Sequence, residues 1–118
     1  MINQAILVGR LTAEPEIIET EEGKKVSNIT LAVPRNFKNS EGVYETDFIN
    51  ITLWNGIAEN TAEYCKKGDV VGVKGRIQSD TYDKNGEKKY ETKVIAEKLT
   101  FLSSRQQEQN KNEQEQDR

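Results

Sequence analysis

The sequence from Tyr44 to Trp54 is Tyr-Glu-Thr-Asp-Phe-Ile-Asn-Ile-Thr-Leu-Trp, and it alternates with the period of two that a β-strand imposes. Three aliphatic residues fall on one side of this predicted strand, as expected of a face packed into a core: Ile49, Ile51 and Leu53. Two aromatic and two polar residues fall on the other side: Phe48, Asn50, Thr52 and Trp54. A half-buried strand normally turns a purely polar face to water, so the aromatic pair needs an explanation.

Two interpretations of Phe48 and Trp54 are open. In the first, the rings form a flat platform on which other flat groups stack, and nucleobases are the commonest partners of such a platform. In the second, the rings fill a second core or a subunit interface, as buried aromatic residues often do. The rest of the chain has to decide between them.

Composition divides the chain into a folded part and a polar tail. A length of 118 residues corresponds to about one domain. The last 16 residues contain no apolar side chain and are dominated by Gln, Asn and Glu, a composition typical of disorder. We therefore expect one domain over residues 1–102 and a disordered tail over residues 103–118.

The charge and the residue types limit the function. The formal net charge is −3, so a nucleic-acid site would have to concentrate its basic residues locally and depend on stacking. Histidine is absent and Cys65 is the single cysteine, which excludes zinc sites of the Cys/His type and histidine-based catalytic triads. We expect no enzyme, no metal and no cofactor, and we interpret Cys65 as a small buried hydrophobe.

The same features bear on the compartment. A single cysteine cannot form an internal disulfide, which fits a reducing cytosol. Neither a signal peptide nor a membrane-spanning run is visible in the sequence. A cytoplasmic protein is expected.

Periodicity along the chain predicts an all-β domain with one helix. Five strands are predicted: Asn3–Leu11, Lys25–Val33, Tyr44–Trp54, Val70–Ile77 and Val94–Leu102. A polar loop, a helix and a hairpin connect them: Arg35–Val43, Ile57–Lys67 and Ser79–Thr92. We expect Pro34 to end the second strand, Gly68 to cap the helix, and Gly9 to mark a bulge or a close backbone approach. This order of elements is that of a five-stranded OB-fold barrel with one short helix between strands three and four.

Aromatic and basic residues supply the candidate binding site. Four aromatic residues lie near Lys or Arg or on a polar strand face: Phe37, Phe48, Trp54 and Tyr82. Six basic residues are candidates for phosphate contacts: Arg10, Arg35, Lys38, Lys74, Arg76 and Lys88. A base stacked on an aromatic ring contributes roughly 1–3 kcal/mol whatever the sequence, and cations between the rings neutralise phosphates. This pattern favours the binding of nucleic acid.

Motifs in these regions also resemble those of bacterial single-stranded DNA-binding proteins. The motifs run in family order over residues 1–102: Ile6-Leu-Val-Gly-Arg-Leu-Thr, Asn28-Ile-Thr-Leu-Ala-Val, Thr46-Asp-Phe-Ile, Lys67-Gly-Asp and Val73-Lys-Gly-Arg-Ile. The resemblance implies a cytoplasmic homotetramer of OB-folds that wraps single-stranded DNA in replication, repair or recombination. It also implies that the four aromatic residues above stack on bases, and that Arg35, Lys74 and Arg76 lie near the DNA path.

Two departures from the family pattern narrow these expectations. Many relatives have a basic residue just before the hairpin aromatic, where this chain has Ser79-Asp80-Thr81. The chain stops at Glu115-Gln-Asp-Arg118, without the acidic tip ending in Pro-Phe, so recruitment of repair proteins through the tail is doubtful. A shorter paralogue, a phage or mobile-element version, and a truncated chain all fit this ending. Two other functions stay open: an RNA-binding OB-fold module, and a module whose aromatic face binds another protein.

Overall fold

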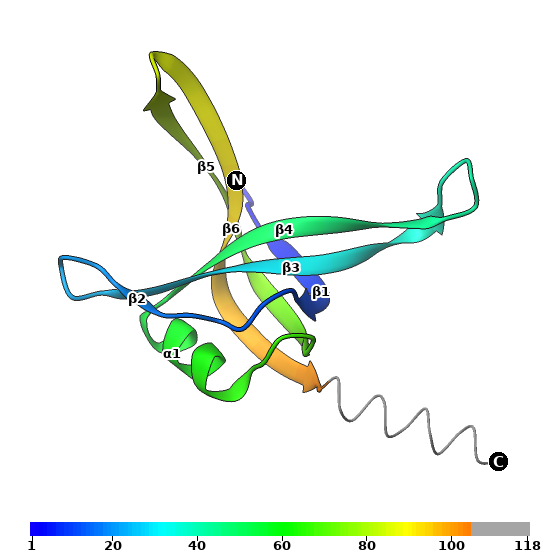
Figure 1. Ribbon diagram of the computed structural model, residues 1–118, viewed down its shortest axis with the longest axis horizontal. Coiled ribbons are helices and arrows are strands. Elements are labelled where there is room, and N and C mark those ends of the chain that lie inside the picture. The colour runs from blue at the N-terminus through cyan, green and yellow to red at the C-terminus, as the bar shows by residue number, and fades with distance from the viewer. Residues whose placement is uncertain (105–118) are drawn as a thin grey trace.

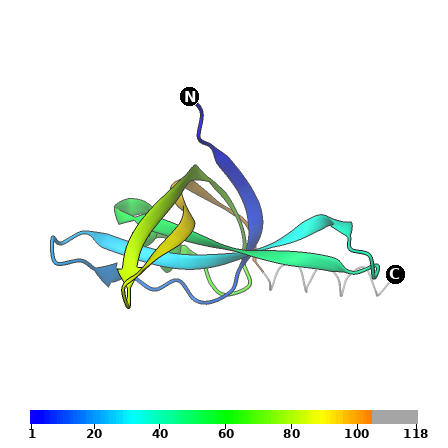
Figure 2. The same ribbon diagram turned by 90° about the horizontal axis from the view of Figure 1, so that it is seen from above.

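The computed structural model describes residues 1–104, and the predicted tail beyond Ser104 therefore lies outside the described residues. The elements follow in the order β1 (Ala5–Leu11), β2 (Ile18–Glu19), β3 (Lys25–Lys38), β4 (Tyr44–Trp54), α1 (Asn55–Tyr64), β5 (Val70–Lys84) and β6 (Glu87–Ser103). Figure 1 shows α1 beside the barrel and two long hairpins, β3–β4 and β5–β6, running out from it. Seen from above, β3–β4 extends to the side opposite the β2–β3 turn (Figure 2).

The strands form one sheet that closes on itself. Their order is β1-β5-β6-β4-β3-β2, and β1 also pairs with β3 through Arg10–Ala32 and Leu11–Leu31. All pairings are antiparallel except β4–β6, which is parallel. Because β2 is only a two-residue addition to β3, the barrel has five strands, with α1 between the third and fourth. The predicted OB-fold is confirmed.

The core lies where the alternation placed it. Ile51 and Leu53 are fully buried, and Ile49 packs against the core. Cys65 is buried with them, which confirms its interpretation as a small hydrophobe. Burial raises the pKa of the Cys65 thiol, with a smaller contribution from Asp69, so the group stays protonated near neutral pH.

The helix begins two residues and ends three residues earlier than the predicted Ile57–Lys67, and Gly68 does not cap it. The helix α1 ends at Tyr64, and Cys65 already has extended backbone angles. The side chain of Asp69 accepts a hydrogen bond from the backbone N–H of Lys66 (2.8 Å), which draws the chain into a separate turn. Gly68, with φ 90°, lies in that turn, and its N–H donates to the carbonyl oxygen of Leu11 (2.8 Å). The turn therefore ties the end of the helix to β1.

Both hairpins are longer than the sequence indicated. Pro34 does not end β3, because it pairs with Thr46 and the strand continues to Lys38. Most of the predicted loop Arg35–Val43 is therefore the arm and turn of a β-hairpin. The other predicted hairpin is confirmed, with Asn85 and Gly86 at positive φ in its turn, but its arms are continuous with β5 and β6.

Gly9 sits at the closure of the barrel, and this gives a test of the fold. A Cβ added at Gly9 would lie 2.4 Å from the carbonyl oxygen of Ala32, so β1 and β3 would have to move apart. We expect Gly9→Ala to lower the free energy of unfolding by about 1–3 kcal/mol, the usual cost of overpacking. Urea denaturation measures this, with Gly72→Ala as the matched control, because a Cβ there meets nothing closer than 3.7 Å. Equal stabilities of the two variants would contradict the prediction.

Candidate nucleic-acid interface

The outer face of β3 and β4 carries Phe48 and Trp54, the two aromatic residues on the non-core side of the Tyr44–Trp54 strand. Residues directly opposite each other in an antiparallel pair share a face, and the register gives four such rungs: Ala32–Phe48, Thr30–Asn50, Asn28–Thr52 and Val26–Trp54. Phe48 and Trp54 are six residues apart, which corresponds to about 20 Å along the strand. The two rings therefore stand at the two ends of one face.

The exposure of the rings excludes a second core, whereas a subunit interface stays open as the alternative to a stacking platform. Phe48 is 66% exposed and Trp54 38% exposed, so neither fills a second core within this chain. Between them the polar side chains are tied to one another across the strands: Thr30 donates to Asn50 (3.2 Å) and Thr52 donates to Asn28 (3.0 Å). The middle of the face is therefore polar and held by hydrogen bonds across the two strands, and an accessible ring lies at each end.

Neighbouring strands widen this face at both ends. Arg10 of β1 pairs with Ala32, which pairs with Phe48, so Arg10 lies on the same face about 10 Å from Phe48. At the other end Ile18 of β2 pairs with Val26, which pairs with Trp54. Ile18 is exposed, and it extends the apolar surface beside the indole ring.

The outer arm of the β3–β4 hairpin carries three more of the predicted residues. Phe37 is exposed near its end, and the ammonium group of Lys38 lies 5.6 Å from the centre of the Tyr44 ring. Arg35 is half-buried and forms salt bridges with Asp47 and Glu45 of β4. The structure therefore groups Phe37 and Lys38 with Phe48 on one hairpin, while the guanidinium of Arg35 is held by carboxylates.

The β5–β6 hairpin separates two residues that the sequence had grouped. Tyr82 is exposed and pairs with Lys89, whereas Lys88 pairs with Asp83 on the adjacent rung. Adjacent rungs face opposite sides of a two-stranded ribbon, so Lys88 does not lie beside Tyr82. Lys89 does, and it forms a salt bridge with Glu87 (3.3 Å).

Lys74 and Arg76 lie below Tyr82 on the same face of β5. Lys74 stands opposite Lys98 of β6, so two cations adjoin there. Further along the strand, Arg76 donates to Gln78 (2.8 Å), and Gln78 donates to Asp80 (3.0 Å).

Asp80 also accepts a salt bridge from Lys93 (3.0 Å). Hydrogen bonds from Lys93 and Gln78 lower the pKa of Asp80. Asp80 thus offsets the charge of Lys93 next to the hairpin aromatic.

A hollow joins the two hairpins. Its volume is about 270 Å³, and it lies between Phe48 and Asn50 of β4, Leu7 of β1, and Ile77 and Thr92 at the base of the β5–β6 hairpin. The side chain of Phe48 therefore borders both the open sheet face and the approach to the second hairpin.

Comparison with known proteins assigns the chain to a family. The model of the single-strand binding protein family matches residues 2–102, which is nearly all of the described part. The chain belongs to this family. Single-stranded DNA-binding protein B of Bacillus subtilis is 48% identical to it over 92% of this chain and 96% of that protein.

The chain spans about two thirds of the length of some other members of the single-strand binding protein family. The single-stranded DNA-binding protein of Halalkalibacterium halodurans is 50% identical over 89% of this chain, but only 63% of that protein is covered. Single-stranded DNA-binding protein 3 of Listeria innocua is 47% identical over 90% of this chain and 67% of its own length.

Sequence reasoning missed several residues of this family member's surface. Ile18 reaches the edge of the face through a strand of two residues, which is too short for a periodicity signal. Lys89 was predicted only to lie near the hairpin aromatics together with Lys88, although a two-residue turn at Asn85 and Gly86 already places it opposite Tyr82. Glu45 and Asp47 lie within Tyr44–Trp54, but the residues next to them in the sequence do not indicate that their carboxylates bind Arg35.

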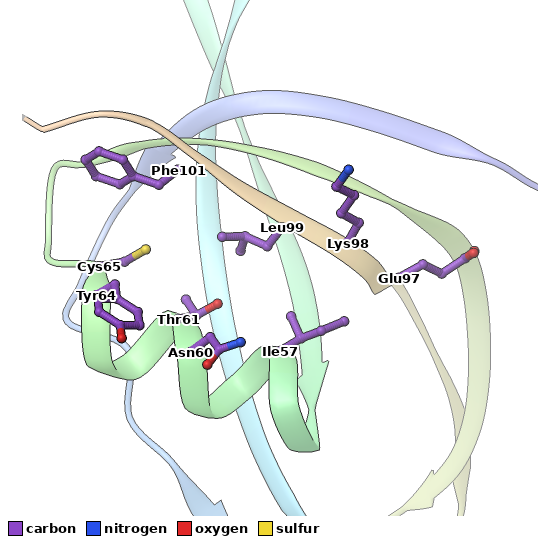
Figure 3. Close-up of a pocket in the computed structure, with 9 residues that line it drawn as sticks. All are labelled: Ile57, Asn60, Thr61, Tyr64, Cys65, Glu97, Lys98, Leu99 and Phe101. Carbon is purple, nitrogen blue, oxygen red and sulfur yellow. The ribbon is translucent and has the colours of Figure 1, made fainter.

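A second hollow in this family member lies away from all the predicted residues. It has a volume of about 260 Å³ and lies between α1 and β6. Figure 3 shows Ile57, Thr61 and Tyr64 of α1 beside Leu99 and Phe101 of β6.

Among residues 1–104 no helix is long and apolar enough to cross a membrane.

Proposed function

We propose that this protein binds single-stranded DNA without sequence preference, by stacking bases on Phe37, Phe48, Trp54 and Tyr82. The observation that carries the proposal is the accessible pair of rings at the two ends of a braced polar sheet face, in a chain of the single-strand binding protein family. Stacking needs only the flat face that every base has, which accounts for sequence tolerance. The role is binding and protection of the strand, without a chemical step, and residues 1–102 form the binding domain.

Phosphate contacts are proposed for five basic residues: Arg10, Lys38, Lys74, Arg76 and Lys88. Arg10 adjoins the Phe48 end of the sheet face, and Lys74 with Arg76 follows the outer face of β5 toward Tyr82. Lys88 lies on the far side of the hairpin and would be reached by a strand that passes around it. Arg35 belongs to the same interface.

A titration with poly-dT tests this function. Saturation should quench the emission of Trp54, the single tryptophan, because its ring would be covered by a base. The affinity should fall as salt rises, with a log–log slope of about −1.4 to −3.5 per subunit if two to five phosphates are neutralised. A flat salt response without quenching would indicate a protein-binding face instead. Tighter binding of an RNA of equal length would indicate an RNA-binding module, since the 2′-hydroxyl distinguishes the two strands.

We also propose that the protein assembles as a homotetramer. The strand β1 supports this, because within residues 1–104 only Arg10 and Leu11 of β1 pair with β3, and the edge from Ile6 to Val8 is left open on that side. Ile6 and Val8 are both exposed next to this open edge. An open edge with apolar side chains is a ready template for pairing with a second copy.

The proposed setting is the cytoplasm, in DNA replication, repair or recombination. The tail beyond Ser104 is proposed to have little part in DNA binding, because its composition is polar and nearly balanced in charge. It also has no apolar residue that could anchor in a partner protein, so recruitment of repair proteins through the tail is not part of the proposal.

A further inference from the structure

The β3–β4 hairpin loses its regular backbone pairing between two of the proposed stacking residues. Pro34 pairs with Thr46 and Lys38 pairs with Tyr44, so three residues of β3 stand against the single residue Glu45 of β4. Phe37 lies within this irregular segment, whereas Phe48 lies on the regular ladder below it. Such an interruption leaves residues unpaired and bends the strand. The backbone ladder therefore does not by itself fix Phe37 relative to β4.

Arg35 bridges the two strands at this point. Its Nε donates to both carboxylate oxygens of Asp47 (3.3 and 3.1 Å), and its Nη2 donates to Asp47 Oδ1 (2.9 Å). Its Nη1 donates to Glu45 Oε2. All three guanidinium nitrogens are thus engaged with β4, in the two-point geometry that gives arginine–carboxylate pairs their directional precision.

The polar contacts continue from Glu45 to the turn of the hairpin. Glu45 Oε1 accepts a hydrogen bond from the side-chain amide of Asn39 (3.3 Å). The side-chain oxygen of Asn39 accepts in turn from the backbone N–H of Glu41 (2.9 Å) and of Val43 (3.0 Å). Phe37 stands between Arg35 and Asn39 in sequence, so side-chain contacts hold the chain on both sides of it.

The charges of this cluster disfavour a direct role for Arg35 in phosphate binding. One guanidinium faces two carboxylates, so the group as a whole carries a net negative charge. The hydrogen bond from Arg35 lowers the pKa of Asp47, which keeps that carboxylate ionised at neutral pH. A phosphate would have to displace a carboxylate from the guanidinium and then lie beside the negative charge it had displaced.

We infer that Arg35 is a positioning residue that holds Phe37 in place for base stacking through Asp47 and Glu45, and that it contacts no phosphate. The inference rests on the proposed function. This role predicts that a substitution of Asp47 changes the affinity for DNA in the opposite direction from the one that charge alone predicts. Removing an acidic group from a DNA-binding face strengthens binding through electrostatics, whereas releasing Phe37 weakens it.

The first experiment measures the affinity of Asp47→Ala for oligo-dT at two salt concentrations. We expect a loss of about fivefold or more, the low end of what one stacked base contributes. The matched control is Glu63→Ala, which makes the same change of charge on the exposed side of α1, away from the hairpin (Figure 1). Tighter binding by Asp47→Ala than by Glu63→Ala would overturn the inference. If the wild-type protein itself fails to bind, the proposed function fails instead.

The second experiment separates positioning from phosphate contact. Arg35→Ala should weaken binding by a similar factor while leaving the salt slope unchanged, whereas loss of a phosphate contact would make the slope less steep by about 0.7 per subunit. In a Phe37→Ala background Arg35→Ala should have almost no further effect, because its action passes through Phe37. Circular dichroism is needed to test whether each variant is folded, and Glu45→Ala provides a milder break of the same cluster. A reduced slope, or an equal loss in both backgrounds, would overturn the inference.

Discussion

Replacing Trp54 by alanine should weaken the binding of single-stranded DNA by roughly 1–3 kcal/mol for each protomer that contacts the strand. The ring lies at the end of the outer face of β4, 38% exposed, with Val26 beside it on β3 and Ile18 beyond on β2. Its inner neighbour Leu53 is fully buried and remains in place, so the fold should survive the substitution. Competition for a labelled oligo-dT measures the change, since the variant has lost its fluorophore.

The control is Tyr64→Ala, which removes a 70% exposed aromatic ring from α1. It should leave the affinity for DNA unchanged. Phe48→Ala should behave like Trp54→Ala, because Phe48 occupies the other end of the same face. If either substitution on β4 leaves no soluble protein, or if Tyr64→Ala costs as much as Trp54→Ala, the platform is not what binds the strand.

The second large expected effect is the loss of subunit assembly when the open edge of β1 is altered. The double substitution Ile6→Asn and Val8→Asn should convert the proposed tetramer to smaller species at micromolar concentration, because it removes the apolar side chains beside the open edge of β1. Affinity for long single strands should fall by about 10²–10⁴-fold, the usual contribution of linked sites. Affinity for an oligonucleotide that fills only one barrel, about 4–16 nucleotides, should change little.

Sedimentation of both proteins, with the two lengths of DNA, measures this prediction. Tyr64→Asn is the control for the loss of an exposed apolar side chain, since α1 packs against β3, β4 and β6 and Tyr64 is not part of the open edge from Ile6 to Val8. A wild-type protein that sediments as a monomer while binding long strands tightly would contradict it. An equal loss of affinity for short and long strands would show that the two residues act within one barrel.

The predictable part of this molecule is what short-range periodicity encodes. The alternation in Tyr44–Trp54 places Ile51 and Leu53 in the core and Phe48 and Trp54 outside it, and the structure has them so. The order of five strands and one helix defines the OB-fold in the same way. These patterns arise from the backbone geometry of a few consecutive residues, so they can be recognised from the sequence without knowing which strands pair.

The unpredicted part depends on residues that meet across strands. Pro34 has no N–H to donate, yet pairing with Thr46 carries β3 past it, and only the partner strand provides that information. The interaction of Arg35 with Asp47 joins residues twelve positions apart, with a turn between them. Gly68 has the positive φ expected of a helix cap, but the side chain of Asp69 ends the helix earlier. In each case a distant partner outweighs the local preference.

The position of β1 in the barrel has a consequence for how the protein is made. Its main partner is Val70–Gly75 of β5, so β1 has to wait for a strand that is synthesised after β3, β4 and α1. At synthesis rates of about 5–20 residues per second, the delay until this partner has been made is on the order of 3–13 s. During that time the β3–β4 hairpin, whose partners adjoin in sequence, forms locally, while Ile6 and Val8 stay unpaired. The barrel therefore closes only after β6, which joins β5 to β4, has also been made, and folding is slow at β1.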